Sequence, residues 1–211
     1  MSASLSLQVV TLPAERLPAE VLLLALFADR RPPRGLAGRA DWRLCGQLSR
    51  LLASGRLRGE PGEAVLIAGA RGLCAARILG LGAGASEDFS DEVARDWVEA
   101  AVDRALDLRV RSAALELPEL ALSVRNRVEI ALAGAARALQ RRGAELCLDL
   151  LVPAVLERSV YDALRSVRPR GLPRPIPIRL PLPPPPAPAG ERDAGSPQPP
   201  RALAAGLPAF K

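Results

Sequence analysis

The feature that most constrains the fold is the apolar run VLLLALF at Val21–Phe27. A strand with one face in water alternates polar and apolar residues, whereas an uninterrupted run of this length is typical of a strand buried on both faces. The run is too short to cross a bilayer as a helix, which needs about 20 apolar residues. A strand buried on both faces requires helices on both sides of its sheet.

Shorter apolar runs and amphipathic patterns alternate along the first 167 residues. Strands are predicted at residues 5–10, 21–27, 63–67, 77–81, 112–117 and 146–150. Helices are predicted at residues 40–55, from a cap at Asp88 or Ser90 to residue 105, at residues 123–143 and at residues 153–167. This interleaving predicts an α/β fold, a three-layer α/β/α domain with a mixed central sheet in which residues 63–67 and 77–81 are core strands.

The ends of two predicted helices carry recognisable residues. Asp41 is a possible cap for residues 40–55 and Gly55 a suitable end, while Ser123 and Gly143 bracket the longest helix. The helix at residues 40–55 has one apolar face, formed by Trp42, Cys45, Leu48 and Leu52. On this pattern both tryptophans, Trp42 and Trp97, are predicted to anchor the core.

The composition changes sharply at residue 168. Residues 168–211 contain 14 prolines and no periodic apolar pattern, which predicts a disordered tail after a folded domain at residues 1–167. The tail holds a net charge of +5 and the domain only +1, out of +6 in total. The tail's charge is spread thinly among prolines, which argues against nucleic acid as a partner.

The residue inventory excludes several kinds of chemistry. The chain has no histidine, and its only lysine is Lys211, so histidine-activated nucleophiles, histidine-bound zinc, phosphate-loop lysines and Schiff bases are all ruled out. The carboxylates fall before a helix and around a proline, where helix capping and solvation explain them; they are Asp88, Asp91, Glu92, Glu116 and Glu119. No catalytic residue, metal site or cofactor is therefore predicted.

The cysteines and the N-terminus suggest a reducing compartment. Cys45, Cys74 and Cys147 are widely spaced and lack a C-x-x-C pattern, which is typical of buried, reduced thiols; Cys74 is the most plausible exposed one. The first residues show neither a positive region nor a cleavage pattern. The sequence thus favours a cytoplasmic protein without a membrane segment.

A glycine cluster in RILGLGAG is the main candidate for a ligand site. Gly80, Gly82 and Ala85 match a G-x-G-x-x-A pattern, but the next helix begins late and with acidic residues, which argues against a dinucleotide. Two interpretations stay open. Either the glycines give a strand end room beside its neighbour, or they form a loop whose N–H groups contact a ligand; the candidate binding residues are Gly80, Gly82, Ala83 and Gly84.

The succession GRLRGEPGEAVLI, AARILGLG and an acidic helix start resembles the N-terminal domain of the leucyl aminopeptidase family. The matching residues are Gly59, Gly62, Glu63, Arg77, Ile78, Leu79, Gly80, Leu81 and Gly82. The resemblance implies a macro-like α/β/α fold. It places the family's two-metal peptidase chemistry in a second, C-terminal domain, whose N-T-D-A-E-G-R-L signature this sequence lacks.

These observations favour a non-catalytic, stand-alone relative of that N-terminal domain, acting as a binding or assembly module. Since full-length members of the family form homo-oligomers, the resemblance implies self-association or docking onto another protein. An ADP-ribose or nucleotide-binding macro-like module, and an accessory subunit of a metalloaminopeptidase, are the alternatives.

Overall fold

The computed structural model describes residues 3–69, 71–118, 123–166 and 177–179. Its centre is a seven-stranded sheet in the order β3-β4-β2-β5-β6-β1-β7. The strands are β1 (Ser4–Val10), β2 (Val21–Phe27), β3 (Ala64–Ala68), β4 (Arg77–Gly84), β5 (Ser112–Leu115), β6 (Glu145–Leu151) and β7 (Ile178–Arg179). All neighbours are parallel except β3, which is antiparallel to β4. The predicted mixed sheet is confirmed.

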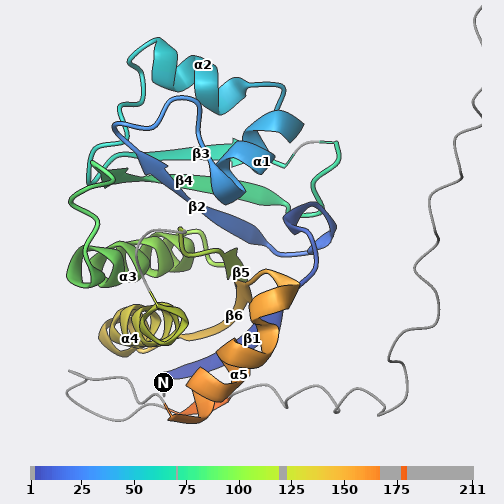
Figure 1. Ribbon diagram of the computed structural model, residues 1–211, viewed down its shortest axis with the longest axis vertical. Coiled ribbons are helices and arrows are strands. Elements are labelled where there is room, and N and C mark those ends of the chain that lie inside the picture. The colour runs from blue at the N-terminus through green and yellow to red at the C-terminus, as the bar shows by residue number, and fades with distance from the viewer. Residues whose placement is uncertain (1–2, 70, 119–122, 167–176, 180–211) are drawn as a thin grey trace, which may run out of the picture.

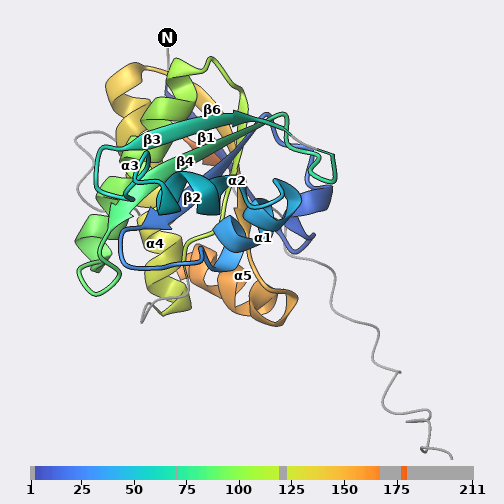
Figure 2. The same cartoon turned by 90° about the horizontal axis from the view of Figure 1, so that it is seen from above.

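Helices cover both faces of this sheet, as Figures 1 and 2 show. The helices are α1 (Gly35–Arg43), α2 (Gln47–Ala53), α3 (Asp91–Asp107), α4 (Val124–Arg142) and α5 (Glu157–Ser166), with short 3₁₀ turns η1 (Ala14–Arg16) and η2 (Ala154–Leu156). Helices α1 and α2 pack over β2, β3 and β4 on one side. Helices α3, α4 and α5 pack on the other, so the two apolar cores confirm the three-layer α/β/α fold.

Strand β2 is buried on both faces, as its uninterrupted apolar run predicts. Val21 and Leu23 belong to the core under α3 and α4, while Leu22, Leu24 and Leu26 belong to the core under α1 and α2. β2 pairs with β4 on one side and with β5 on the other. This position on both faces of the core explains why the run contains no polar residue.

Helices α3 and α4 begin and end where the sequence indicates. The hydroxyl of Ser90 accepts a hydrogen bond from the N–H of Val93, the hydroxyl of Ser123 accepts one from Asn126, and Gly143 ends α4 in the left-handed conformation. The two helices cross closely at Gly134, where a Cβ would lie 2.6 Å from the carbonyl oxygen of Arg95. Trp97 is buried in this layer, as predicted.

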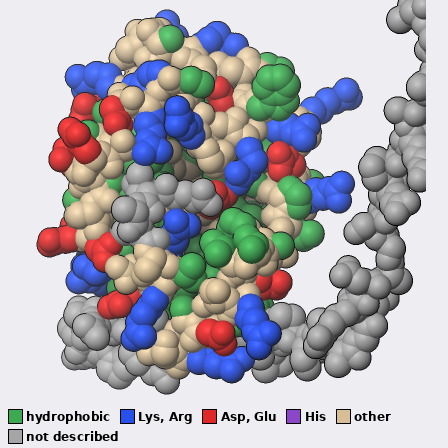
Figure 3. Space-filling model, viewed as in Figure 1, with side chains coloured by type: hydrophobic (Ala, Val, Ile, Leu, Met, Phe, Trp, Pro, Cys, Tyr) green, Lys and Arg blue, Asp and Glu red, His purple; other side chains and the backbone are tan. Residues whose placement is uncertain are grey.

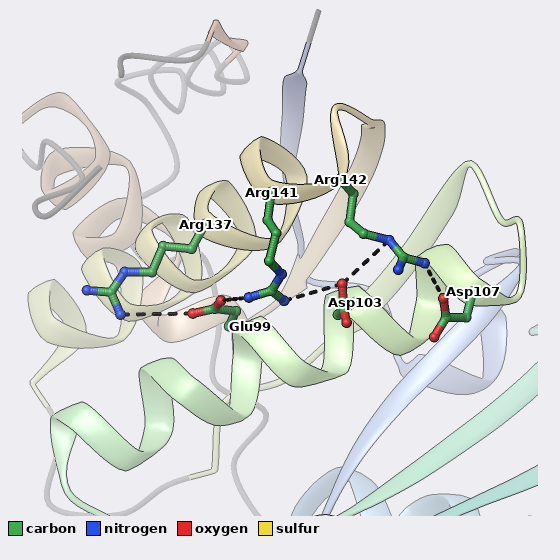
Figure 4. Close-up of polar contacts among 6 residues, drawn as sticks. All are labelled: Glu99, Asp103, Asp107, Arg137, Arg141 and Arg142. Carbon is green, nitrogen blue, oxygen red and sulfur yellow. Dashed lines mark hydrogen bonds and ion pairs between the residues drawn. The ribbon is translucent and has the colours of Figure 1, made fainter. Parts of the chain in front are cut away.

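A ladder of ion pairs joins α3 to α4, as Figure 4 shows. Arg141 contacts Glu99 and lies 3.3 Å (Nη2 to Oδ1) from Asp103, and Arg142 contacts both Asp103 and Asp107. Arg137 lies 4.0 Å from Glu99 (Nη1 to Oε2). The charged outer sides of the two helices therefore neutralise each other.

The helix predicted at residues 40–55 is in fact two helices. Cys45 and Gly46 both have positive φ, 54° and 77°, which ends α1 and turns the chain before α2. Asp41 is a cap, but of the second helix: it is buried, and its carboxylate accepts hydrogen bonds from the N–H groups of Leu48 (2.7 Å) and Ser49 (3.2 Å). The apolar residues that α1 buries are Leu36, Ala37 and Ala40, whereas Trp42 is 81% exposed, so its predicted role in the core is wrong.

Three further expectations need correction. Strand β3 is an edge strand rather than a core strand, with Leu66 half-exposed. Cys45 is exposed and Cys147 half-buried rather than buried, whereas Cys74 is exposed as expected, and all three cysteines are free thiols. Ile178 and Arg179, inside the predicted disordered tail, pair with Leu5 and Ser6 of β1. The rest of the tail, Val167 and Glu119 lie outside the described residues.

Within the described residues, no helix combines the length and the apolar character needed to cross a lipid bilayer.

Candidate functional site

A cleft of about 550 Å³ opens at the carboxyl ends of the parallel strands. Its lining comes from the ends of β2 and β6 and from the segments that follow β1 and β5, together with the start of α1. In α/β sheets this edge is where ligands usually bind, since the loops that leave parallel strands converge there. The architecture therefore brings residues far apart in the sequence to one site.

The amino end of α1 forms one wall of the cleft. Gly35, Leu36 and Ala37 line it, and their N–H groups have no acceptor inside the helix because they belong to its first turn. The first turn of α1 contains no acidic residue. A helix start of this kind attracts negative charge through its dipole and its unpaired donors.

The charged residues of the cleft are three arginines and one glutamate. Arg39 forms an ion pair with Glu116, and an oxygen of Glu116 lies 3.8 Å from the position of a Cβ on Gly35, close to the helix start. Among the described residues, Arg30 and Arg34 form no ion pair with a carboxylate. The cleft thus carries two arginines beyond the Arg39–Glu116 pair, and Figure 3 shows Arg side chains as the most frequent charged groups over α1 and α2.

The loop that carries Arg30 and Arg34 is held by other polar residues. The carboxylate of Asp29 accepts hydrogen bonds from the N–H (2.9 Å) and the hydroxyl (2.6 Å) of Ser86, and these bonds lower its pKa. The guanidinium of Arg31 donates to the carbonyl oxygens of Phe27 (2.7 Å) and Arg58 (2.9 Å). These contacts fix the loop, so Arg30 and Arg34 project from an ordered backbone.

The turn that supports this loop is organised by Glu63. Its carboxylate accepts hydrogen bonds from the N–H groups of Arg58 (2.7 Å) and Gly59 (2.9 Å) and pairs with the Arg58 side chain. These interactions hold the pKa of Glu63 at about 2, led by the bond from the Arg58 N–H. Beneath the loop, Phe27 meets Phe89 edge-on at 5.1 Å, and the guanidinium of Arg30 lies 5.2 Å from the Phe27 ring.

The glycines proposed from the sequence lie elsewhere. Gly80, Gly82, Ala83 and Gly84 belong to strand β4 rather than to a loop, are buried, and do not line the cleft. A Cβ on Gly80 would lie 2.7 Å from Leu26, and one on Gly82 would overlap the carbonyl oxygen of Glu60. Close neighbours thus account for these two glycines, and ligand binding by this segment stays a prediction.

The other chemistry-bearing residues do not converge. Asp91 accepts a hydrogen bond from the amide of Asn126, and Asp88 and Glu92 are exposed at the start of α3. Burial raises the pKa of Cys147, with a smaller contribution from Asp149. In the part of the chain that the structure describes, no group of histidine, cysteine, aspartate or glutamate side chains could hold a metal ion.

The sequence interpretation missed the cleft arginines. Arg30 and Arg34 lie in the segment between β2 and α1, and Glu116 directly follows β5, so they come after the carboxyl ends of parallel strands. Arg39 lies in α1, the next helix along the chain. The position of Arg30, Arg34 and Glu116 after predicted parallel strands could have indicated a shared site. The charge of residues 1–167, summed as a whole, hid it because acidic residues of α3 cancel the arginines near α1.

Comparison with known proteins adds a family to this geometry. The profile of the N-terminal domain of the cytosol aminopeptidase family matches residues 23–165. No match was found among curated proteins. A tomato leucine aminopeptidase mutant aligns with a TM-score of 0.57 at 18% identity, covering 78% of this chain. The chain spans only 36% of that enzyme.

Two macrodomains share the fold, over 90% and 68% of their own lengths. The Oceanobacillus iheyensis macrodomain with ADP has a TM-score of 0.60 at 14% identity, covering 76% of this chain and 90% of its own. The Trypanosoma brucei macrodomain in complex with ADP has a TM-score of 0.60 at 16% identity, covering 75% of this chain and 68% of its own. At these identities the likeness shows a macro-like fold and nothing more.

Proposed function

Because this chain belongs to the cytosol aminopeptidase family through that family's N-terminal domain, we propose that it acts as a non-catalytic binding module in the cytoplasm. Its ligand is a small phosphate-bearing molecule of the nucleotide class, held in the cleft at the carboxyl ends of the parallel strands. The exposed free thiols of Cys45 and Cys74 suit a reducing compartment.

The observation that carries this proposal is the charge of the cleft. The free N–H groups at the start of α1 and the side chains of Arg30 and Arg34 converge on one space of about 550 Å³. Arginine and a helix start are the groups that proteins commonly use to bind phosphate. Two structurally similar macrodomains were solved with ADP, which supports the choice of ligand class.

Glu116 adds a negative charge to the lining of the same cleft. Its carboxylate already lies near the start of α1 and is neutralised by Arg39. A phosphate that enters the cleft must therefore approach Arg30 and Arg34 and tolerate one nearby negative charge. This arrangement favours a ligand with spread negative charge over a compact carboxylate.

Isothermal titration calorimetry with ADP tests the proposal. We expect saturable binding to the whole chain, a loss of about tenfold or more in Arg34→Glu, and a gain in Glu116→Gln, because these changes add and remove a like charge. Arg56→Glu is the matched control, since Arg56 is exposed and lies outside the cleft. Absence of heat with both ADP and ADP-ribose at millimolar concentration would remove the proposal.

The non-catalytic part has its own assay. The purified chain, supplied with manganese or zinc, should release no product from a leucine anilide. Turnover that survives gel filtration with the chain would overturn this part and leave the ligand proposal standing.

A second candidate is assembly of two copies. It is favoured by β3, which has no strand beyond it among the described residues. The N–H of Gly82 donates to the carbonyl of Glu63 (2.9 Å), and the N–H of Gly69 donates to the carbonyl of Ala76 (2.8 Å). These bonds show which residues of β3 direct their backbone groups towards β4. The N–H and C=O groups of Ala64, Leu66 and Ala68 consequently point away from β4. Two such edges can pair antiparallel about a two-fold axis, with Leu66 opposite Leu66 and Ala64 opposite Ala68.

Light scattering across a concentration series tests the assembly. We expect a dimer that Leu66→Lys converts to a monomer, because a charge on an exposed edge opposes strand pairing. Val93→Lys changes an exposed apolar residue of α3 and should leave the dimer intact. A wild-type chain that stays monomeric at high micromolar concentration would exclude this candidate.

A further inference from the structure

The most exposed aromatic residue of the described chain, Trp42, lies beside the cleft. Its side chain is 81% exposed, whereas Trp97 is 5% exposed. Trp42 lines a shallow hollow of about 500 Å³ together with Glu15, Pro33, Arg34, Gly35, Gly38 and Arg39. Exposure of one ring is common on protein surfaces, so the position of Trp42 in this hollow, next to the cleft, is the observation that matters.

The hollow and the cleft form one continuous surface. Pro33, Arg34, Gly35 and Arg39 line both of them. Gly35, Gly38 and Trp42 recur at helical spacing, so they follow one face of α1 away from its amino end. Trp42 lies seven residues beyond Gly35, which places it about 10 Å along the helix axis.

The chemistry of the hollow differs from that of the cleft. Two glycines, a proline and Trp42 line it together with three charged residues. Flat aromatic groups bind such surfaces by stacking on the indole, with arginine nearby to contact their edges or faces. Among the described residues, the lining includes one carboxylate, Glu15, and Arg43 lies 3.7 Å from it (Nε to Oε1).

We infer that the ligand of the cleft extends along α1 and stacks a planar ring on Trp42. The inference rests on the proposed function, because the phosphate-bearing part occupies the cleft. It narrows the ligand class to a phosphate ester with an aromatic base or ring at one end, and it assigns Trp42 as the residue that selects for the ring.

Tryptophan fluorescence with ADP as the probe tests the inference on the whole chain. ADP should quench Trp42 and protect it from acrylamide, while inorganic pyrophosphate should bind without either effect. Trp97 is shielded by the core, so acrylamide reports mainly on Trp42 in the unmodified protein; Trp97→Phe makes the signal specific if that variant folds.

Calorimetry on Trp42 variants completes the test. Trp42→Ala should weaken ADP about tenfold and leave pyrophosphate unchanged, whereas Trp42→Phe should keep most of the affinity because it keeps a ring. Val93→Ala, which truncates an exposed apolar residue on α3, is the matched control and should bind normally.

The outcomes separate the inference from the function beneath it. Two results together overturn the ring site and leave the cleft proposal intact: Trp42→Ala binds ADP normally, and ADP does not quench the fluorescence of the unmodified chain. No binding of ADP or pyrophosphate overturns both. Protection of Trp42 that depends on protein concentration and not on ADP overturns the inference in favour of a protein contact.

Discussion

The two helical layers use the same charged residue types for opposite purposes. Helices α3 and α4 contain seven arginines and seven acidic residues, and their side chains pair across the helix crossing (Figure 4). Residues 28–58, which include α1 and α2, contain eight arginines and two aspartates. The charges of the α3–α4 layer therefore balance, whereas the α1–α2 layer has an excess of positive charge.

The difference follows from what the carboxylates bind. In the α1–α2 half, Asp29, Asp41 and Glu63 accept hydrogen bonds from backbone N–H groups and so shape turns and helix ends. In the α3–α4 half, Glu99, Asp103 and Asp107 contact arginines. Arg39, Arg43 and Arg58 of this half also pair with carboxylates. Among the described residues, Arg30 and Arg34 form no such pair, so they stay available for a ligand in the cleft.

The largest expected effect comes from a substitution at Gly134, where α3 and α4 of the charge-balanced layer lie closest. Gly134→Leu should lower the free energy of unfolding by about 3 kcal/mol or more, because its side chain would meet the backbone of Arg95 and the side chain of Val98. Urea denaturation measures the loss. Ala100→Leu, on the exposed side of α3, should change stability by less than about 0.5 kcal/mol; equal losses in both variants would contradict the close crossing.

The second largest effect is expected from a substitution at Asp41, in the α1–α2 layer. Asp41→Ala should cost about 2 kcal/mol in urea denaturation, because it leaves the N–H groups of Leu48 and Ser49 without their buried acceptor. Asp41→Asn keeps an acceptor oxygen and should lose less. A negligible loss in Asp41→Ala would contradict the hydrogen bonds from Leu48 and Ser49.

The third effect is a pH dependence of stability that comes from Glu63, a carboxylate that binds backbone N–H groups. The pKa of Glu63 is about 2 in the folded chain, against an ordinary value of 4.5. A lowered folded pKa stabilises the fold fully above pH 4.5, and this contribution disappears as the pH falls towards 2. The stability difference between wild type and Glu63→Gln should therefore shrink over that window in denaturation at several pH values; a constant difference would refute the assignment.

The smallest effect concerns the ladder itself. Arg141→Met should cost less than about 1 kcal/mol, because Arg141 is half-exposed and solvent screens its ion pairs. The loss should fall further in 1 M salt, where the screening length is about 3 Å. Asp41→Ala, which removes backbone hydrogen bonds, should keep its cost in the same salt, and an equal salt response would erase the distinction between the layers.

Much of the fold was predictable because its signals are local. The apolar run of β2 specified burial on both faces, and Ser90, Ser123 and Gly143 marked the helix ends correctly. The break between α1 and α2 was not predictable from periodicity, since Trp42, Cys45, Leu48 and Leu52 continue one helical face across it. The positive φ of Cys45 is a tertiary outcome, stabilised by the turn that Asp41 caps.

The candidate site was harder to predict than the fold. Its arginines and Glu116 come from segments that meet only because β1, β2, β5 and β6 run parallel and end at one edge. The glycine pattern at Gly80 and Gly82 looked more specific, but their close neighbours explain it sterically. A motif reports local geometry, whereas the strand order determines which side chains meet.

Strand β7 has a practical consequence for anyone who shortens the chain. Ile178 and Arg179 pair with β1, and the N–H of Leu5 donates to the carbonyl of Pro177 (3.0 Å). Cutting at residue 167, where the composition changes, would remove these bonds and leave unpaired backbone groups at the edge of β1, with which a strand of another molecule can pair. A soluble truncation should keep the chain through residue 179.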